Sequence, residues 1–494
     1  MPKTIFAHGL AVTMNSKYQL IEDAAVVTEA DKIIFVGAFD TYKDQIAETD
    51  SVIDCTGQLI LPGFIDSHAH AGHCMNRALG WDTRSRWMGY MTNIYHFNST
   101  PDYWYWEGRL ASLERLKAGI TCGVNVLTNA GRCDDPRIAV AQADAYATTG
   151  VRQILAIGPS NPPYPRAFGQ WRDDDQGGHF ERVELSFDEV MQKAEEAIEL
   201  THHSHNGLIE AFIAPFVMVT SVQPSGPTPA DMAVRLTEHD RKMMKAVREI
   251  AKRQKTRIHT EAFGGMIRMA AQSEDALLGP DVHVQHCKGI GIDEALILAE
   301  THTHVTTSPG WSQIFNRCPV PTLMGLGVNV AISTDGTSPG IPYDLIQAAR
   351  NLAMITQGAE RDFFYLPCGK LLSMITIDAA KAIGRENDLG SLETGKQADI
   401  ITVDLQKPHL TPNFLPIHKL MLYGNASDVD TVMVQGKLRM VKRQVLGIDE
   451  AEVLKEATEE SLRTIRRAGY EKLLEPSDTF WTGYRNLVFE ERLA

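Results

Sequence analysis

The sequence predicts an α/β fold, in which a TIM-like (β/α)8 barrel is joined to a small β-sandwich domain. Two observations predict this fold. Short apolar runs alternate with amphipathic stretches through the middle of the chain, and β-rich segments lie at both of its ends. The chain has 494 residues, which is enough for a barrel and a satellite domain.

The β-rich segments lie before residue 62 and after residue 390. Residues 32–37 and 430–437 are typical, because β-branched and apolar residues cluster there between turn-forming residues. We therefore predict three parts of the chain. They are a β-sandwich domain built by residues 1–62 plus 390–445, a barrel of residues 63–389, and a helical C-terminal extension of residues 446–494.

The middle of the chain alternates between strand-like and helix-like segments. Apolar runs such as residues 122–127 and 209–214 resemble buried parallel strands, whereas residues 189–200 repeat apolar positions at helical spacing. The number of these units favours a closed barrel over an open sheet. No phosphate-binding glycine motif is present, so a nucleotide cradle is not supported.

Composition limits the partners and the compartment. The formal net charge is −14, which disfavours nucleic acid and anionic membrane surfaces as partners. The expected partner is a small-molecule substrate, about which net charge says little. No apolar run approaches the roughly 20 residues that a bilayer requires. The seven cysteines are scattered without a C-x-x-C pair, so neither a disulfide framework nor a thiolate zinc site is indicated. A cytoplasmic location is expected.

The motif His68-Ala69-His70 is the strongest chemical signal. Side chains alternate along a strand, so His68 and His70 point to the same side and can share one metal ion. The alternative is a pair of polar residues at a strand end. Further candidates end other apolar runs, where a barrel gathers its catalytic groups. These candidates are His259, Glu261, His286 and Asp335.

The order of these residues along the chain resembles the amidohydrolase superfamily. More narrowly, it resembles the branch of triazine hydrolases and of guanine, cytosine and adenosine-analogue deaminases. The supporting motifs are residues 62–68 (Pro-Gly-Phe-Ile-Asp-Ser-His), 333–336 (Ser-Thr-Asp-Gly) and 390–399 (Gly-Ser-Leu-Glu-Thr-Gly-Lys-Gln-Ala-Asp). The resemblance covers nearly the whole chain except about the last forty residues.

The resemblance implies a site with one divalent metal ion, zinc first and iron as the alternative. The implied ligands are His68, His70, His259 and Asp335. Asp335 would also take a proton from the attacking water. His286 matches the residue that orients the water or the leaving group, and Glu261 is the implied proton shuttle. Homo-oligomers are common in this superfamily, so one is expected here.

Three further residues are candidates for contact with the substrate. Trp81 and Trp87 lie in the loop that follows the first metal strand, where loops commonly line the pocket. Phe216 stands where many deaminases of this branch carry a histidine, and its ring can bind a substrate by stacking.

The spacing of Glu261 departs from the pattern of the branch. It follows His259 by two residues, whereas the deaminases place this glutamate three residues later. On a continuing strand, Glu261 would still share the face of His259. The implied activity is attack of water on an sp² carbon, with release of ammonia or an amine from a cyclic nitrogenous substrate. The alternatives are hydrolysis of an amide, carbamate or urea-type C–N bond, and a catalytically silent scaffold.

Overall fold

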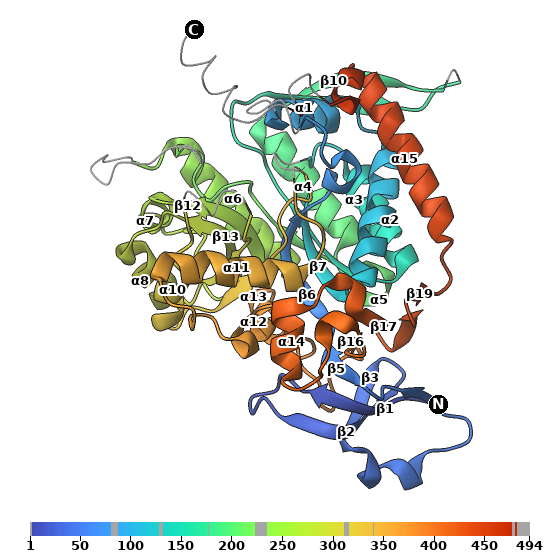
Figure 1. Cartoon of the computed structure of the whole chain (residues 1–494). Helices are drawn as coiled ribbons and strands as arrows, with labels where there is room; N and C mark the ends of the chain where they lie inside the picture. The colour runs from blue at the N-terminus through green and yellow to red at the C-terminus, as the bar shows by residue number, and fades with distance from the viewer. Residues whose placement is uncertain are drawn as a thin grey trace.

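A computed structural model describes residues 2–80, 87–127, 132–175, 177–222, 235–310, 316–338, 340–476 and 480–481. Its centre is an eight-stranded parallel sheet in the order β15-β14-β13-β12-β11-β8-β7-β6, which curls into a barrel (Figure 1). The strands are β6 (Phe64–His70), β7 (Ile120–Val126), β8 (Arg152–Ile157), β11 (Ile209–Ile213), β12 (Ile258–Phe263), β13 (Val282–Lys288), β14 (His304–Thr307) and β15 (Val330–Ile332).

The barrel closes between its first and last strands just beyond the end of β15. The backbone N–H of Asp335 donates to the carbonyl of His68 at 3.0 Å, and Ala69 pairs with Asp335 in a parallel bridge. This closure brings the carboxyl end of β6 beside the chain that follows β15. The barrel is the one expected from the alternating pattern.

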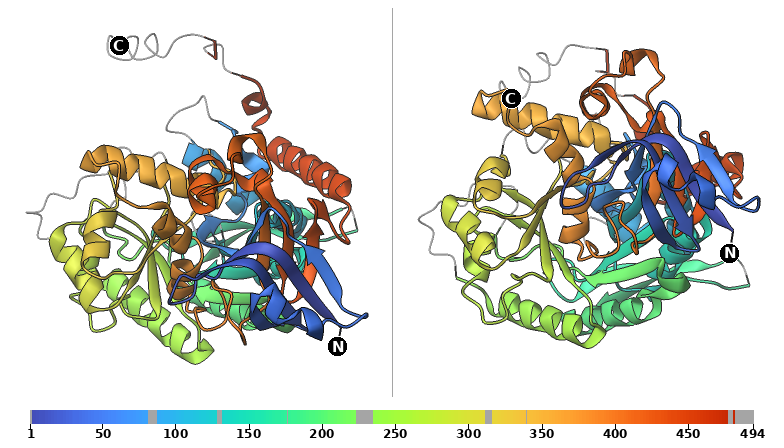
Figure 2. Two further views of the ribbon diagram at one scale, coloured as in Figure 1. Left: turned by 60° about the horizontal axis from the view of Figure 1, so that its bottom comes forward. Right: turned by 90° about the horizontal axis from the view of Figure 1, so that it is seen from below.

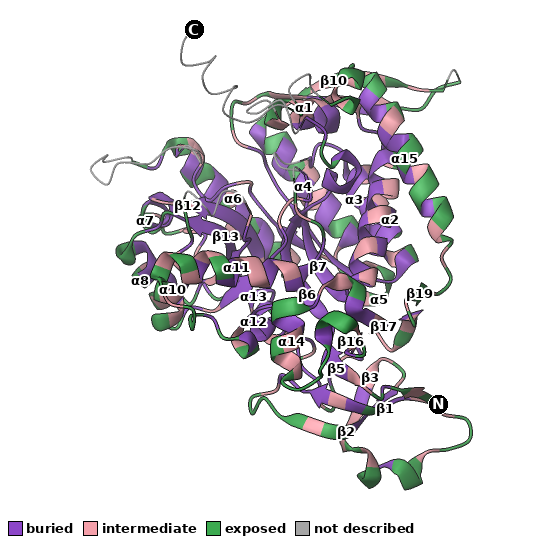
Figure 3. Ribbon diagram, in the orientation of Figure 1, coloured by how far each residue is buried: buried purple, intermediate pink, exposed green. Residues whose placement is uncertain are grey.

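Helices surround the barrel, and their buried faces point toward the strands (Figure 3). In α4, Ser186 caps the first turn and the Glu189 side chain returns to the backbone of Ser186. The helices are α1 (Trp87–Asn93), α2 (Pro101–Lys117), α3 (Pro136–Thr149), α4 (Phe187–Thr201), α5 (Ser204–Gly207), α6 (Glu238–Gln254), α7 (Met266–Ala270), α8 (Ile292–Glu300), α10 (Val320–Gly325), α11 (Leu345–Glu360), α12 (Cys368–Met374) and α13 (Ile377–Ala382).

A second, nine-stranded sheet combines both ends of the chain. β5 pairs antiparallel with β16, so the N-terminal and the C-terminal strands lie side by side, as Figure 2 shows. The expected terminal sheet is therefore present, while the exact domain boundaries stay a prediction. The strands are β1 (Lys3–Val12), β2 (Leu20–Glu29), β3 (Lys32–Ala38), β4 (Ser51–Asp54), β5 (Gln58–Pro62), β16 (Ile400–Asp404), β17 (Val429–Val434), β18 (Lys437–Val441) and β19 (Gln444–Val445).

A hairpin of two strands and two further α-helices lie outside these two sheets and the surrounding helices. β9 (Arg166–Arg172) and β10 (His179–Leu185) form an antiparallel hairpin between β8 and α4, which the sequence analysis did not predict. α14 (Pro416–Tyr423) connects β16 to β17. α15 (Glu450–Arg467) packs along α2, and its Ser461 hydroxyl donates to the carbonyl of Met75 at 2.7 Å.

The seven cysteines are all free and buried. Within the described ranges, no helix combines the length and the apolar character that crossing a bilayer demands.

Candidate active site

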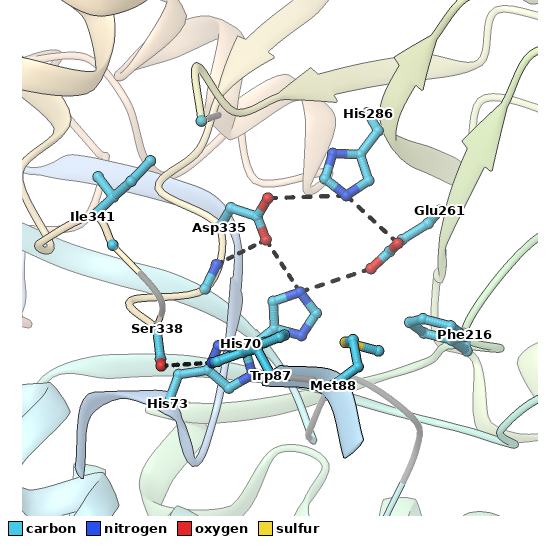
Figure 4. A pocket seen from close by; sticks show the side chains of 13 residues that line it. His70, His73, Trp87, Met88, Phe216, Glu261, His286, Asp335, Ser338 and Ile341 are labelled. Atoms are coloured by element: carbon cyan, nitrogen blue, oxygen red, sulfur yellow. Dashed lines mark hydrogen bonds and ion pairs between the residues drawn. The ribbon is translucent and has the colours of Figure 1, made fainter. Parts of the chain in front are cut away.

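The carboxyl ends of four barrel elements bring six side chains into one group, and four of these side chains line a cavity (Figure 4). β6 ends with His68 and His70, whose alternation places both rings on one side of the strand, as the sequence predicts. The other four come from β12, β13 and the residues after β15. They are His259, Glu261, His286 and Asp335.

Two of these residues occupy left-handed backbone conformations. His286 has φ 76° and Asp335 has φ 65°, values that are uncommon for residues other than glycine. The turn at His286 breaks the alternation of β13. Alternation alone would place His283 and His286 on opposite faces, but with this turn both rings lie inside the barrel. The ring of His283 stacks on His259 and its Nε2 lies 3.2 Å from the carbonyl of Ser67, contacts that suit a structural role.

Three donor atoms form a compact triangle. His70 Nε2 lies 3.1 Å from Asp335 Oδ1, His68 Nε2 lies 3.3 Å from His70 Nε2, and His68 Nε2 lies 3.5 Å from Asp335 Oδ1. Ligands at roughly 2.0–2.1 Å from a tetrahedral zinc ion lie about 3.3–3.4 Å from one another. The spacing and the donor types of this triangle therefore fit a divalent metal ion.

His259 joins the group from the other nitrogen of His68. Its Nε2 lies 2.7 Å from His68 Nδ1, and its Nδ1 lies 3.2 Å from the carbonyl of His283. The contact between the two imidazoles is a hydrogen bond, so binding of one ion by both rings requires that this bond be replaced. The backbone carbonyl at Nδ1 is the kind of partner that orients a metal-binding histidine.

Glu261 lies across the cavity from Asp335. Its carboxylate oxygens lie 3.7 Å from His70 Nε2 and 3.5 Å from His286 Nε2, and His286 Nε2 lies 3.9 Å from Asp335 Oδ2. The shortened spacing from His259 therefore still brings this carboxylate into the site. Besides that triangle, two further groups among the described side chains have donor atoms close enough to hold a metal ion. They are His68 with His286 and Asp335, and His68 with His70 and Glu261.

Burial and charge set the protonation of the group. Burial lowers the pKa of His68 to about 4 and holds the pKa of His259 well below its ordinary value, so both rings are neutral at pH 7. Burial acts to raise the pKa of Glu261 and of Asp335, but His286 and the other nearby imidazoles outweigh it and lower both values. Neutral imidazoles and ionised carboxylates are the forms that bind metal.

The cavity has a volume of about 250 Å³. Two of the three residues proposed for substrate contact, Trp87 and Phe216, line it, whereas Trp81 lies outside the described residues. Met88 and Ile341 add to its apolar wall. A cavity of this size with aromatic walls suits a flat ring system.

Sequence reasoning did not single out several polar residues at the site. The Ser308 hydroxyl donates to Asp335 Oδ2 at 2.9 Å, and the position of Ser308 directly after β14 was a usable signal. His73 and Ser338 line the cavity. His73 is a third histidine, three residues after His70, and its closeness to the His68-Ala69-His70 motif was a usable signal.

Comparisons with known proteins agree with this geometry. The family model described as "Amidohydrolase family" matches residues 59–439. A 5-methylthioadenosine/S-adenosylhomocysteine deaminase from Moorella thermoacetica is 26% identical over 458 residues, which cover 89% of this chain and 98% of the relative.

Two solved structures share the fold. An adenosine deaminase from Xanthomonas campestris with bound zinc has a TM-score of 0.76 at 20% identity, and the match covers 94% of this chain and 99% of the other. An atrazine chlorohydrolase from Arthrobacter aurescens in complex with zinc has a TM-score of 0.73 at 20% identity, with 93% and 100% covered.

Proposed function

Because the chain belongs to the amidohydrolase family, we propose that it is a deaminase that releases ammonia from the aminopurine ring of an adenosine-type nucleoside. Family membership confirms the resemblance drawn from the sequence, and with it the prediction of a metal-dependent enzyme that hydrolyses C–N bonds. The relative from Moorella thermoacetica is named for two adenosine derivatives, which supports this class of substrate.

The observation that carries the proposal is the position of Glu261. Deamination requires a group that delivers a proton to the departing nitrogen, and the Glu261 carboxylate lies on the cavity wall between His70 and His286. Asp335 faces it from the other side of His286. A carboxylate pair of this kind can accept a proton from water at one oxygen and release one to a leaving group at another.

We propose His68, His70, His259 and Asp335 as the ligands of one divalent ion, zinc first and iron as the alternative. A bound ion supplies Lewis acidity, which lowers the pKa of water from about 15.7 toward about 7. The triangle of His68, His70 and Asp335 supports this assignment, as does the zinc in the two related structures.

Each side chain of the site then has a separate role in the reaction. Asp335 accepts the proton of the attacking water, and the hydrogen bond from Ser308 keeps its Oδ2 oriented. Glu261 carries a proton to the departing amine. His286 stabilises the charge that develops at the attacked centre. Trp87 and Phe216, which line the cavity, contact the substrate ring.

Hydrolysis of an amide, carbamate or urea-type bond is the second candidate. Phe216 favours it, because a phenyl ring can neither donate nor accept a proton where many deaminases have a histidine. A catalytically silent scaffold is the third, and the retained group of histidines and carboxylates opposes it.

The test is a substrate panel with the purified enzyme. Adenosine, 5′-methylthioadenosine, guanine, an aminotriazine and an aryl carbamate are each assayed for ammonia and for amine release. We expect ammonia from the two nucleosides, with kcat/KM above roughly 10⁴ M⁻¹s⁻¹ for at least one of them. Amine release from the carbamate without ammonia from any ring would favour the second candidate, and no turnover together with no bound metal would favour the third.

Two further expectations belong to this proposal. A cytoplasmic location suits a chain whose seven cysteines are all free. A homo-oligomer is expected from the family, and light scattering on the purified protein measures its subunit number.

A further inference from the structure

Two phenylalanines lie next to each other, almost fully exposed, in the loop between α11 and α12. Phe363 is 88% exposed and Phe364 is 89% exposed. A single exposed apolar side chain is ordinary on a protein surface, but each aromatic ring leaves roughly 150–250 Å² of mostly apolar area in water. Two such rings side by side therefore indicate a surface that another molecule covers.

The loop that carries the two rings is anchored to the protein. The side chain of Asp362 accepts a hydrogen bond from the backbone N–H of Phe364 at 2.8 Å, and the Gln357 amide donates to the carbonyl of Tyr365 at 2.9 Å. Leu366, at φ 56°, then returns the chain to the core, where its side chain is buried. Because both ends of the loop are tied down in this way, the phenyl rings are held at the surface.

An apolar groove lies where α12 and α14 meet the start of β2. Its volume is about 370 Å³. Lys370 lines it, but the ammonium of this lysine is paired with Asp378 at 2.6 Å. Most of the lining is apolar or aromatic, and it includes Val12, Met14, Tyr18, Leu20, Leu372 and Ile417. A groove of this size and lining suits an aromatic side chain, whose burial there would remove apolar surface from water on both partners.

The loop and the groove belong to one stretch of surface. Gly369 lines the groove and is only five positions after Phe364. α12 packs against α14, and the exposed Phe414 and Leu415 lie just before α14 begins. Figure 1 shows α12 beside α14, with β1 and β2 below them. We call this surface the aromatic face, and it comprises Tyr18, Leu20, Phe363, Phe364, Tyr365, Phe414 and Leu415.

The exposed area of the aromatic face is large for a monomer. Its two adjacent phenylalanines alone leave about 300–400 Å² exposed, and all its side chains together leave roughly 800 Å². The largest apolar patch on a typical monomer is about 300–600 Å². A stable complex buries about 800 Å² on each partner, so the aromatic face has the area that one half of a dimer interface needs.

We propose that a second copy of this chain docks on the aromatic face, with the loop of Phe363 and Phe364 from each copy in the groove of the other. A twofold symmetric dimer joins one surface to itself, so every projection must find its recess on that same surface. The aromatic face carries both parts, namely the projecting rings and the apolar groove. An unrelated partner would need only one of the two.

Charge substitution in the loop tests the dimer. Light scattering and sedimentation velocity measure the mass of the purified full chain from about 0.1 to about 50 μM, a range that covers ordinary dimer affinities. We expect the wild type to contain two chains, or a multiple of two, at about 1 μM. In the double variant Phe363→Asp with Phe364→Asp, the concentration for half association should rise at least roughly 100-fold, because two buried anchors are replaced by charges that docking would desolvate.

Leu20→Lys tests the groove separately. Leu20 lines the groove and is 54% exposed, so a lysine there should weaken association without disturbing the core. An equimolar mixture of the loop variant and Leu20→Lys should recover the dimer mass in part. In the mixed dimer one loop–groove contact is wild type, and the other places aspartates against a lysine. General damage to the fold would not produce this recovery.

Ile292→Asp is the matched control. Ile292 is 60% exposed at the start of α8, where a carboxylate suits the helix N-terminus. This variant should keep the wild-type mass, and circular dichroism establishes that each variant is folded. A wild type of one chain per particle at every concentration would overturn the inference and leave the face to a different protein. A folded loop variant that associates as tightly as the wild type would overturn it as well. The mass readings involve no substrate, so failure of the proposed function would not affect them.

Discussion

Asp66 and Thr334 join the first and last strands of the barrel through two hydrogen bonds. The backbone N–H of Thr334 donates to Asp66 Oδ1 at 2.9 Å, and its hydroxyl donates to Asp66 Oδ2 at 2.7 Å. Arg115 Nη2 completes the pairing at 2.9 Å from Asp66 Oδ2, and all three side chains are buried. Because Thr334 directly precedes Asp335, this contact helps fix the left-handed turn that aims the Asp335 carboxylate into the site.

Replacing Thr334 tests this positioning. Thr334→Val keeps the shape but removes the hydroxyl donor, so we expect kcat to fall roughly 10-fold, which corresponds to about 1.4 kcal/mol of activation free energy. Thr334→Ser keeps the donor and should retain activity within about 3-fold. Steady-state kinetics and metal analysis measure both. A larger loss in Thr334→Ser than in Thr334→Val would show that the threonine methyl, not its hydroxyl, matters.

Asp335→Ala tests the proposed metal site. The variant removes the carboxylate that lies 3.1 Å from His70 Nε2, so we expect kcat to fall by at least roughly 100-fold and the bound metal to decrease. Elemental analysis of the purified variant gives the metal content per chain. If occupancy and turnover both stayed at wild-type levels, the assignment of Asp335 would be wrong.

Glu261→Gln separates proton transfer from metal binding. The amide has nearly the same shape but cannot carry a proton, so kcat should fall roughly 10²–10⁴-fold while KM and metal content change little. A loss of metal in this variant would instead make Glu261 a ligand, as its distance of 3.7 Å from His70 Nε2 also permits. The matched control is Glu210→Gln, because Glu210 lies on β11 and pairs with Arg385.

Removal of the metal should abolish turnover reversibly. Dialysis against a chelator is expected to remove most of the activity, and added Zn²⁺ should restore it, because imidazole and carboxylate donors bind this ion well. Titration with Zn²⁺ and with Fe²⁺ under anaerobic conditions compares the two candidates. Recovery with Fe²⁺ that clearly exceeds recovery with Zn²⁺ would reverse the proposed preference.

Asp378 predicts a pH dependence of stability away from the active site. Burial acts to raise the pKa of Asp378, but Lys370 and Ser373 outweigh it and hold the pKa below its ordinary value. A carboxylate whose pKa is lowered in the folded state stabilises the fold at pH values above its pKa in the unfolded chain, which is about 3.9. This contribution disappears as the pH falls through the folded-state pKa.

We therefore expect Asp378→Asn to lower the free energy of unfolding by about 1–3 kcal/mol at pH 7. The difference from the wild type should shrink as the pH is lowered below about 4. Urea unfolding at a series of pH values measures it. A difference that stayed constant over the whole acidic range would mean that the charge of Asp378 contributes nothing.

The barrel and the grouping of its histidines and carboxylates were predictable because their signals are local. Apolar runs of strand length record burial on both faces of a parallel sheet, and the spacing of His68 and His70 follows directly from strand alternation. The same rule placed Glu261 correctly on the face of His259, despite its unusual spacing. The hairpin of β9 and β10 was missed, since an inserted hairpin leaves the barrel pattern unchanged.

The sequence by itself determined the fold class, the family and the residue types that can carry the chemistry. Only the tertiary structure decided how they meet. The left-handed turns at His286 and Asp335 override strand alternation. The ring of His73 is placed at the cavity wall by stacking on His70. Asp66 accepts a hydrogen bond from Thr334, which lies 268 positions later in the chain. Such contacts depend on closure of the barrel, which brings distant chain segments together. The sequences of these segments carry no periodic pattern that would reveal the contact.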